Sequence, residues 1–322
     1  MEFEYRTICR GDRSIFGRLK KAGIQNPEEY ISFYALRAYD KIDSEAVKKA
    51  KDKIIDRLSR DSKLSSQLYP IISNIKNPIV TEQIYIHSKL MIVDDQIVIC
   101  GSANVNDRSQ LGMHDSEIAA IIRDNDKVDS KLAGKPIKAS RFAVSLRRYL
   151  FKEHLGLLHV SENHLSEVTS YSYPPPLHIK NGSQRLQTDE EKKLEDPASD
   201  EFFVFWKGIA EKNTKIFKDV FHCLPDDDVK TWDDYQNFVP DPKKIPLGHV
   251  YDPDKISELE NIKGHLVHYP YRFLEEEEVS TLKKIETLND LRDDFKELEF
   301  AVESELIGNL ATSSEHAAAF AG

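Results

Sequence analysis

The stretch His87-Ser88-Lys89-Leu90-Met91-Ile92-Val93-Asp94-Asp95 organises the sequence around it. Its apolar residues, followed by two aspartates and a second apolar run, predict a β-hairpin with strands at 84–93 and 96–100 joined by a tight turn. In an extended strand, His87 and Lys89 point to the same face and lie about 7 Å apart. An imidazole and an ammonium on one face can bind a single anion together, so this hairpin is the first candidate for a functional site.

The second strand of the hairpin runs into Gly101-Ser102-Ala103-Asn104. Gly101 permits a close approach of the backbone, and the side chains of Ser102 and Asn104 can both donate hydrogen bonds. Together with the lysine they form a set of donors suited to a tetrahedral phosphate, and the histidine titrates near neutral pH. A lone histidine or lysine is more often a packing or surface residue. The conjunction of all these groups on one hairpin favours a phosphate-binding site.

Strands and helices alternate along the remaining sequence, which is typical of an α/β architecture. We expect a mixed β-sheet formed by strands near Tyr30, Ile84, Gln96 and Ile118, covered by helices. The near-continuous apolar run at 116–122 predicts a strand that is buried on both faces. The expected strands are 30–36, 84–93, 96–100, 116–122 and 264–269. The expected helices are 45–59, 140–158 and 202–221, with one charged helix or a pair of helices at 275–310.

Composition divides the chain into four expected segments. The stretch 171–176 and the stretch 182–197 are polar and contain prolines, which is typical of a loop or linker, and 226–255 is expected to be irregular. The segments are 1–160 (which contains the hairpin motif), 161–200 (a loop or linker), 201–275 (the C-terminal part of the same fold) and 276–322 (a charged helical tail, partly disordered).

The bulk composition limits the possible partners. The 322 residues are 40% hydrophobic and 31% charged, which is ordinary for a globular protein with a sizeable core. The net charge of −10 argues against extended nucleic-acid binding and against a strong general attraction to anionic membranes. It does not exclude a local basic pocket for one phosphate.

The expected location of the protein follows from two kinds of segment that the sequence lacks, a membrane span and a signal peptide. It has no run of about 18 apolar residues that would span a bilayer, and no apolar signal-peptide core near its first residue. We therefore expect an intracellular protein, or a fragment whose start lies elsewhere. Three widely separated cysteines predict buried free thiols rather than a disulfide framework or a metal site, and the apolar run around Cys100 supports its burial.

The pattern His87-x-Lys89-x4-Asp94, followed by Gly101-Ser102-x-Asn104, matches the HKD motif of the phospholipase D superfamily, which this chain resembles. The longer string at 87–119 is similar to the second motif of eukaryotic-type, phosphatidylcholine-cleaving phospholipase D. The resemblance covers roughly 5–274 and implies a phospholipase D-like catalytic half. Further stretches that resemble the family are 5–15, 30–37, 146–156, 206–214 and 264–267.

The resemblance implies a two-step displacement through a covalent phosphohistidine, with no metal ion or other cofactor. The histidine of the family's first motif attacks phosphorus, so His87 would protonate the leaving alcohol and then activate water. Lys89, Ser102 and Asn104 would hold the non-bridging phosphate oxygens and stabilise the transition state. Glu117 resembles the carboxylate that orients an active-site imidazole in the family. Here it would orient the imidazole of the opposing half.

Two further positions of the motif are expected to be structural. Gly101 serves the close backbone approach, and Asp94 is a turn residue that we expect to be held by a local ion pair. The family carries two HKD motifs in one chain, whereas this sequence contains one. His178 is also followed two residues later by a lysine, but the aspartate is lacking, so we interpret that match as chance.

Three functions stay open. The first is a phospholipase D that converts phosphatidylcholine to phosphatidic acid and choline, or transfers the phosphatidyl group to another alcohol, once an N-terminal catalytic half completes the site. The second is a homodimeric single-motif phosphodiesterase that brings two copies of His87 together. The third is a non-catalytic fragment that binds phospholipid or regulates a relative.

The expected partners are phosphatidylcholine and other glycerophospholipids at a peripheral membrane surface, with no nucleic acid. The expected location is the cytoplasm, at membranes. Where a complementary half would dock, we expect an unusually apolar or poorly covered patch around His87.

Overall fold

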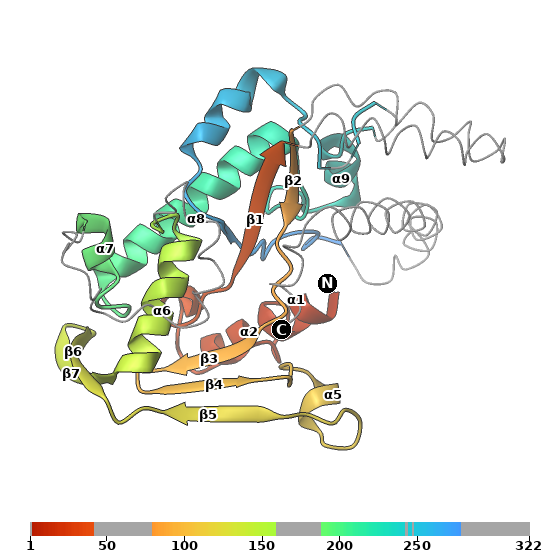
Figure 1. The fold of residues 1–322 in the computed structure, drawn as a ribbon. Coiled ribbons are helices and arrows are strands. Elements are labelled where there is room, and N and C mark those ends of the chain that lie inside the picture. The colour runs from red at the N-terminus through yellow and green to blue at the C-terminus, as the bar shows by residue number, and fades with distance from the viewer. Residues whose placement is uncertain (1, 42–78, 159–187, 242–243, 247, 278–322) are drawn as a thin grey trace, which may run out of the picture.

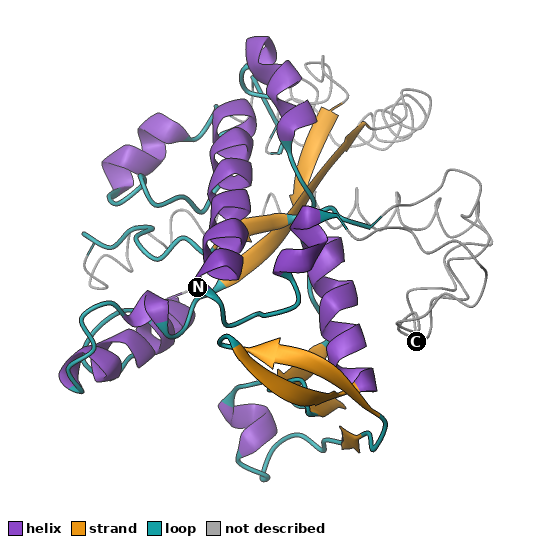
Figure 2. Cartoon of the chain, turned by 90° about the vertical axis from the view of Figure 1, so that its left-hand side faces the viewer, coloured by secondary structure: helices purple, strands orange, loops and turns teal. Residues whose placement is uncertain are grey.

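The computed structural model describes residues 2–41, 79–158, 188–241, 244–246 and 248–277. Helices and small antiparallel sheets alternate along the chain, which confirms the expected α/β class. The described strands form three separate sheets rather than one mixed sheet. Figure 2 shows the strands in two groups, with helices packed beside the upper one.

The first sheet has the strand order β2-β1-β8 and lies beside the long helix α8 (Figure 1). Its central strand β1 (Tyr34–Lys41) pairs antiparallel with both β2 (Ile79–Gln83) and β8 (Leu266–His268). Helix α8 (Asp200–Phe221) is joined to the sheet by Asn213, whose amide nitrogen donates to the carbonyl oxygens of Lys263 (2.8 Å) and Leu266 (2.9 Å). Because Asn213 is buried, these bonds satisfy an amide that would otherwise be costly to bury.

The hydrophobic core lies between α8 and this sheet. One cluster contains Leu36 of β1 with Phe202 of α8, and a second contains Phe217 of α8 with Leu259 of the 3₁₀ helix η3 (Pro253–Asn261). Two further helices, α6 (Arg141–His154) and α7 (Asp189–Lys193), end close to the first cluster, which includes Leu155 and Leu194.

The second sheet carries the hairpin motif. Strands β3 (Lys89–Val93), β4 (Ile97–Gly101) and β5 (Ala119–Arg123) pair antiparallel in that order, as Figure 1 shows at the bottom of the view. A third sheet is the hairpin of β6 (Lys127–Leu132) and β7 (Lys135–Ser140).

The expected strand at 84–93 is wrong in its first half. Residues 84–88 form no strand, because the chain leaves the first sheet at Gln83 and joins the second at Lys89, and this crossing has no ladder partner. The amide of Ile84 still donates to the carbonyl oxygen of Leu36 in β1 (2.9 Å). His87 therefore lies outside the strand, and strand alternation does not relate it to Lys89.

The burial predicted for the run at 116–122 is also wrong. Ile121 is 63% exposed, and Ile118, just before the strand, is 80% exposed. An apolar run indicates that both faces of a strand can be buried. In the described part of the chain, however, nothing covers the exposed side chains of this strand. Tyr85, Ile86 and Met91 are exposed too, so the expected apolar patch around His87 is confirmed.

Other predicted elements are found with shifted ends. Strands expected at 30–36 and 264–269 are β1 and β8, and helices expected at 140–158 and 202–221 are α6 and α8. The expected loop at 182–197 contains α7, and the expected irregular stretch 226–255 contains α9 (Trp232–Phe238); each begins with a capping box. The remaining short elements are α1 (Glu2–Ile8), α2 (Ile15–Lys21), η1 (Pro27–Glu29) and α5 (Asp107–Gln110).

Some predictions are not tested by this structure. The helix expected at 45–59 and nearly all of that at 275–310 lie outside the described residues. The four-segment division of the chain stays a prediction. The three cysteines are free thiols as expected, but the predicted burial is wrong, because Cys100 is exposed and Cys9 and Cys223 are half-buried. Among the described helices, none combines the length and apolar character needed to cross a membrane.

Candidate active site

The turn between β3 and β4 is anchored to helix α6. Asp94 and Asp95 both have left-handed backbone conformations (φ 49° and 53°), and they are the central residues of a tight turn that the Gln96 amide closes on the Val93 carbonyl oxygen (2.8 Å). The Asp95 carboxylate accepts hydrogen bonds from Nε (2.7 Å) and Nη2 (2.8 Å) of Arg147, and both side chains are buried. The ion pair expected at Asp94 thus lies one residue further on, and Asp94 itself is exposed. This pair fixes the hairpin that carries Lys89.

Gly101 lies close against the backbone of the chain at the start of β5. A Cβ atom at this position would stand 2.5 Å from the carbonyl oxygen of Ile118 and 2.7 Å from the Cα of Ala119. Both atoms belong to backbone, so a side chain here would push the strands apart. The glycine thereby holds the end of β4 against the residues that follow Glu117.

His87 is exposed on the irregular segment that precedes β3. Its ring contacts the ring of Tyr85, with centroids 6.0 Å apart. The Nζ of Lys89 donates to the backbone carbonyl oxygen of His87 (2.6 Å), so the ammonium lies against the loop that carries the imidazole. Within the described residues, the imidazole nitrogens have no hydrogen-bond partner and are open to a ligand.

Ser102 and Glu117 form a hydrogen-bonded pair next to Lys89. The Ser102 hydroxyl donates to Oε2 of Glu117 (2.5 Å) and accepts from the backbone amide of Ile118 (3.0 Å). Hydrogen bonds from Ser102 and Ser109 lower the pKa of the exposed Glu117 carboxyl, and the nearby charge of Lys89 lowers it further. The carboxylate is therefore ionised at neutral pH.

Asn104 lies on the exposed loop between β4 and β5. The loop is folded on itself, because its Asn104 carbonyl oxygen accepts from the Gln110 amide (2.9 Å) and Arg108 pairs with Asp115 (2.9 Å). In the described part of the chain, the side-chain amide of Asn104 has no hydrogen-bond partner. The structure thus joins Lys89 to the His87 loop and Ser102 to Glu117, but it shows no direct contact between Asn104 and those side chains.

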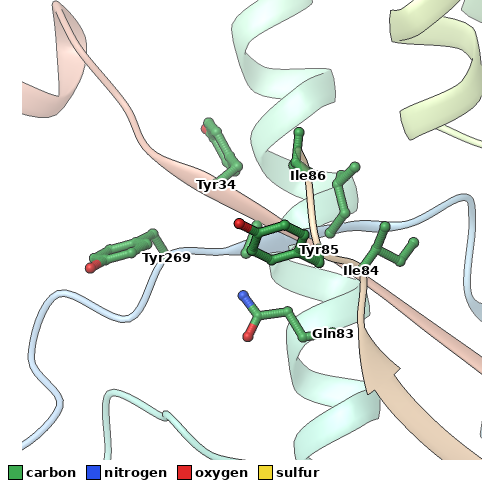
Figure 3. Close-up of a pocket in the computed structure, with 8 residues that line it drawn as sticks. Tyr34, Gln83, Ile84, Tyr85, Ile86 and Tyr269 are labelled. Carbon is green, nitrogen blue, oxygen red and sulfur yellow. The ribbon is translucent and has the colours of Figure 1, made fainter. Parts of the chain in front are cut away.

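A pocket of about 360 Å³ opens beside the His87 loop, where β2 separates from β1. Figure 3 shows Tyr34, Tyr85 and Tyr269 around this space, on three different segments of the chain. Gln83 is its polar wall, and the other lining residues are Ala35, Leu36, Ile84 and Ile86.

Sequence reasoning missed this pocket and the Asp95–Arg147 pair. The signal for the pair was the doubled aspartate, although its partner lies 52 residues away. Tyr85, two residues before His87, was a visible signal for the pocket. Within the described ranges, no group of three or more His, Cys, Asp or Glu side chains is placed to hold a metal ion. The donors that are present suit an oxyanion.

These side chains, spaced as His-x-Lys-x4-Asp ahead of Gly-Ser-x-Asn on one antiparallel hairpin and the segments that flank it, define an HKD-motif protein. A family model described as phospholipase D matches residues 1–182 of the chain. The chain belongs to the phospholipase D family.

Relatives from plants and animals extend the match beyond that region. The chain is 35% identical to phospholipase D zeta 1 of Arabidopsis thaliana over 298 residues, which cover 87% of this chain and 22% of the relative. It is 34% identical to phospholipase D1 of Homo sapiens over 279 residues (86% and 20%), and 34% identical to phospholipase D2 of Bos taurus (86% and 23%). The chain therefore spans about a fifth of the length of these relatives.

Proposed function

We propose that the chain supplies the acid–base half of a phospholipase D active centre. The complete centre would hydrolyse phosphatidylcholine to phosphatidic acid and choline at a membrane surface facing the cytoplasm. The observation that supports this best is the grouping of Lys89, Ser102 and Glu117 at the sheet end next to the exposed His87. It combines a proton donor, a cation and a hydroxyl within reach of one phosphodiester.

The reaction proceeds in two steps. A histidine nitrogen of the complementary half attacks phosphorus, a P–N bond forms and the P–O bond to the leaving alcohol breaks. Protonated His87 donates its proton to the departing oxygen. Neutral His87 then removes a proton from water, the water oxygen attacks phosphorus and the P–N bond breaks. An alcohol in place of water gives transphosphatidylation.

The remaining residues stabilise charge. When a phosphodiester enters, Lys89 exchanges the carbonyl oxygen of His87 for a non-bridging phosphate oxygen, and Ser102 and Asn104 donate to the same group. The ionised Glu117 accepts an N–H from the imidazole of the complementary half and thereby fixes its tautomer.

The surface around the site is suited to receive that half. Met91, Ile99 and Ile121 are paired across the three strands, so they form one apolar row. By alternation along β3, this row lies on the same face of the sheet as Lys89. Exposed apolar surface of this kind marks an interaction site. The complementary half would thus cover the apolar row and bring its histidine to the same phosphate.

The test is complementation. The chain alone should release no choline from phosphatidylcholine vesicles, whereas a mixture with a first-motif half from a relative should release choline and transfer the phosphatidyl group to 1-butanol. His87→Ala should abolish the activity of the mixture. His114→Ala, at another exposed histidine, is the matched control and should retain it. Activity of the mixture that survives His87→Ala would overturn the proposal, and His87-dependent activity of the chain alone would favour the homodimer.

A further inference from the structure

A second pocket, of about 270 Å³, lies where helix α1, strand β1 and helix α8 meet. We call it the Arg37 pocket, because Arg37 of β1 lines it together with Phe217 and Lys218 of α8. Among the described residues, its lining includes none of the loop 84–88 that carries His87. Sites for drug-sized molecules enclose roughly 300–1,000 Å³, so a pocket of this volume suits a small ligand.

Arg37 is the unpaired charge in this lining. Among the other charged residues around the pocket, Nζ of Lys218 lies 3.1 Å from Oδ1 of Asp226, and Glu4 also has an interaction partner. The guanidinium of Arg37 has no hydrogen-bond or ion-pair partner in the described part of the chain, and its contact with the Phe217 ring is distant, at 6.0 Å. Because Arg37 is half-buried, water cannot satisfy all of its N–H groups. Such unpaired donors cost free energy that an acceptor would recover.

Further polar atoms of the lining residues also lack partners. The hydroxyl of Tyr5 and Nε2 of His268 are buried and form no hydrogen bond within the residues that the structure describes. The Thr214 hydroxyl accepts from the backbone amide of His268 (2.9 Å) and keeps its own hydrogen for another acceptor. Unsatisfied polar atoms are uncommon inside proteins. Their concentration around one pocket indicates that a ligand completes it.

The charges around the pocket select a monoanion. One unpaired guanidinium balances one negative charge, whereas the carboxylates of Glu4 and Asp226 in the same lining repel a second. A planar guanidinium can donate two parallel hydrogen bonds to a carboxylate. The lining also supplies apolar surface, since Phe217, Val267 and Tyr269 border the same space. The ligand that fits therefore combines one carboxylate with an apolar body.

We propose that the Arg37 pocket binds a small organic monocarboxylate. The carboxylate accepts hydrogen bonds from Arg37 and Thr214, and the apolar body lies against the rings of Phe217 and Tyr269. The bound ligand bridges β1 and α8, so it stabilises the packing of the first sheet against this helix. The proposal goes beyond the phosphodiester chemistry proposed for His87, because no part of it involves that histidine.

Binding of three probes to the purified chain tests the ligand class. Benzoate, benzyl alcohol and phenyl phosphate carry the same ring with a monoanionic, a neutral and a mostly dianionic group. Each is titrated at neutral pH and low chloride, and NMR follows the methyl resonance of Thr214 and the ring resonances of Phe217. Benzoate should bind at least about 10-fold more tightly than benzyl alcohol, as expected for a charge-assisted hydrogen bond, and more tightly than phenyl phosphate. Equal binding of benzoate and benzyl alcohol, or tighter binding of phenyl phosphate, would overturn the proposal.

Substitutions of Arg37 test the place of binding. Arg37→Gln should weaken benzoate binding about 10- to 100-fold, and Arg37→Lys, which keeps the charge but not the planar fork, should weaken it less. Arg123→Gln is the matched control, because Arg123 is exposed on β5 outside the lining, and it should leave binding unchanged. Benzoate binding that survives Arg37→Gln in a folded variant would overturn the proposal. If Arg37→Gln does not fold, the comparison of the three probes on the natural chain still decides it.

Discussion

Arg147 holds Asp95 through two hydrogen bonds, of 2.7 Å and 2.8 Å, and so connects the turn between β3 and β4 to helix α6. Arg147 also donates from Nη1 to the carbonyl oxygen of Leu194 (2.8 Å), just after α7. One guanidinium thus joins three segments that are distant in the sequence. Lys89 begins the strand that this turn ends. The pair therefore positions the end of the sheet that carries Lys89 from its opposite end.

The first prediction concerns this ion pair. Asp95→Asn leaves the buried guanidinium of Arg147 without a carboxylate, and removing one partner of a buried pair costs about 3–5 kcal/mol of unfolding free energy. Urea denaturation measures the loss. Asp94→Asn is the control, since its exposed side chain changes identically and asparagine tolerates the left-handed turn; it should shift the unfolding free energy by less than about 0.5 kcal/mol. Equal effects of the two substitutions would contradict the role assigned to the pair.

The second prediction concerns the contact between β4 and β5. Gly101→Ala places a Cβ against the backbone of Ile118 and Ala119 and should destabilise the protein by about 1–3 kcal/mol. Gly208→Ala is a control in the interior of α8, where an added Cβ meets open space. It should stabilise the protein by roughly 0.5–1 kcal/mol, because alanine favours the helix. Thermal unfolding of both variants measures the opposite signs, and a neutral Gly101→Ala would show that the strands can separate freely.

Local patterns in the sequence were sufficient for part of this fold. The helical spacing of α6 and α8 and the tight turn at Asp94 and Asp95 depend on neighbouring residues, so they could be predicted. The exposure of Ile121 could not, because an apolar strand has the same pattern whether or not its second face is covered.

The same distinction between local and long-range features applies to the candidate site. The identities of His87, Lys89, Ser102 and Glu117 came from the sequence, but their geometry did not. His87 lies outside the strand because the chain changes sheets between Gln83 and Lys89, and strand pairing is a long-range property. The partner of Asp95 is likewise set by packing between segments 52 residues apart.

The third prediction concerns the dependence of stability on pH. Burial lowers the pKa of His154 and of His268 below the ordinary value of 6.5. As the pH falls through 6.5, the unfolded chain therefore binds more protons than the folded one. The contribution of these two histidines to the unfolding free energy is fully present above that pH, and it is lost as the pH decreases. Urea denaturation at pH values of about 7.5 and about 5.5, on either side of the ordinary histidine pKa, measures the change. His154→Gln should reduce the difference, and His114→Ala, at an exposed histidine, should not.

The last prediction concerns the charge of the candidate site. The Ser102 hydroxyl donates to the Glu117 carboxylate and so stabilises the ionised form. Ser102→Ala should therefore raise the pKa of Glu117 toward its ordinary value of 4.5, as followed by carbon NMR of the side-chain carboxyl. Lys89→Met should raise the pKa less, because the charge of Lys89 is the smaller cause. Ser88→Ala, at an exposed serine beside His87, should leave the pKa unchanged. A Glu117 pKa that ignores Ser102 would mean that the two side chains are apart in solution, and the proposed placement of the carboxylate for a second imidazole would then lose its support.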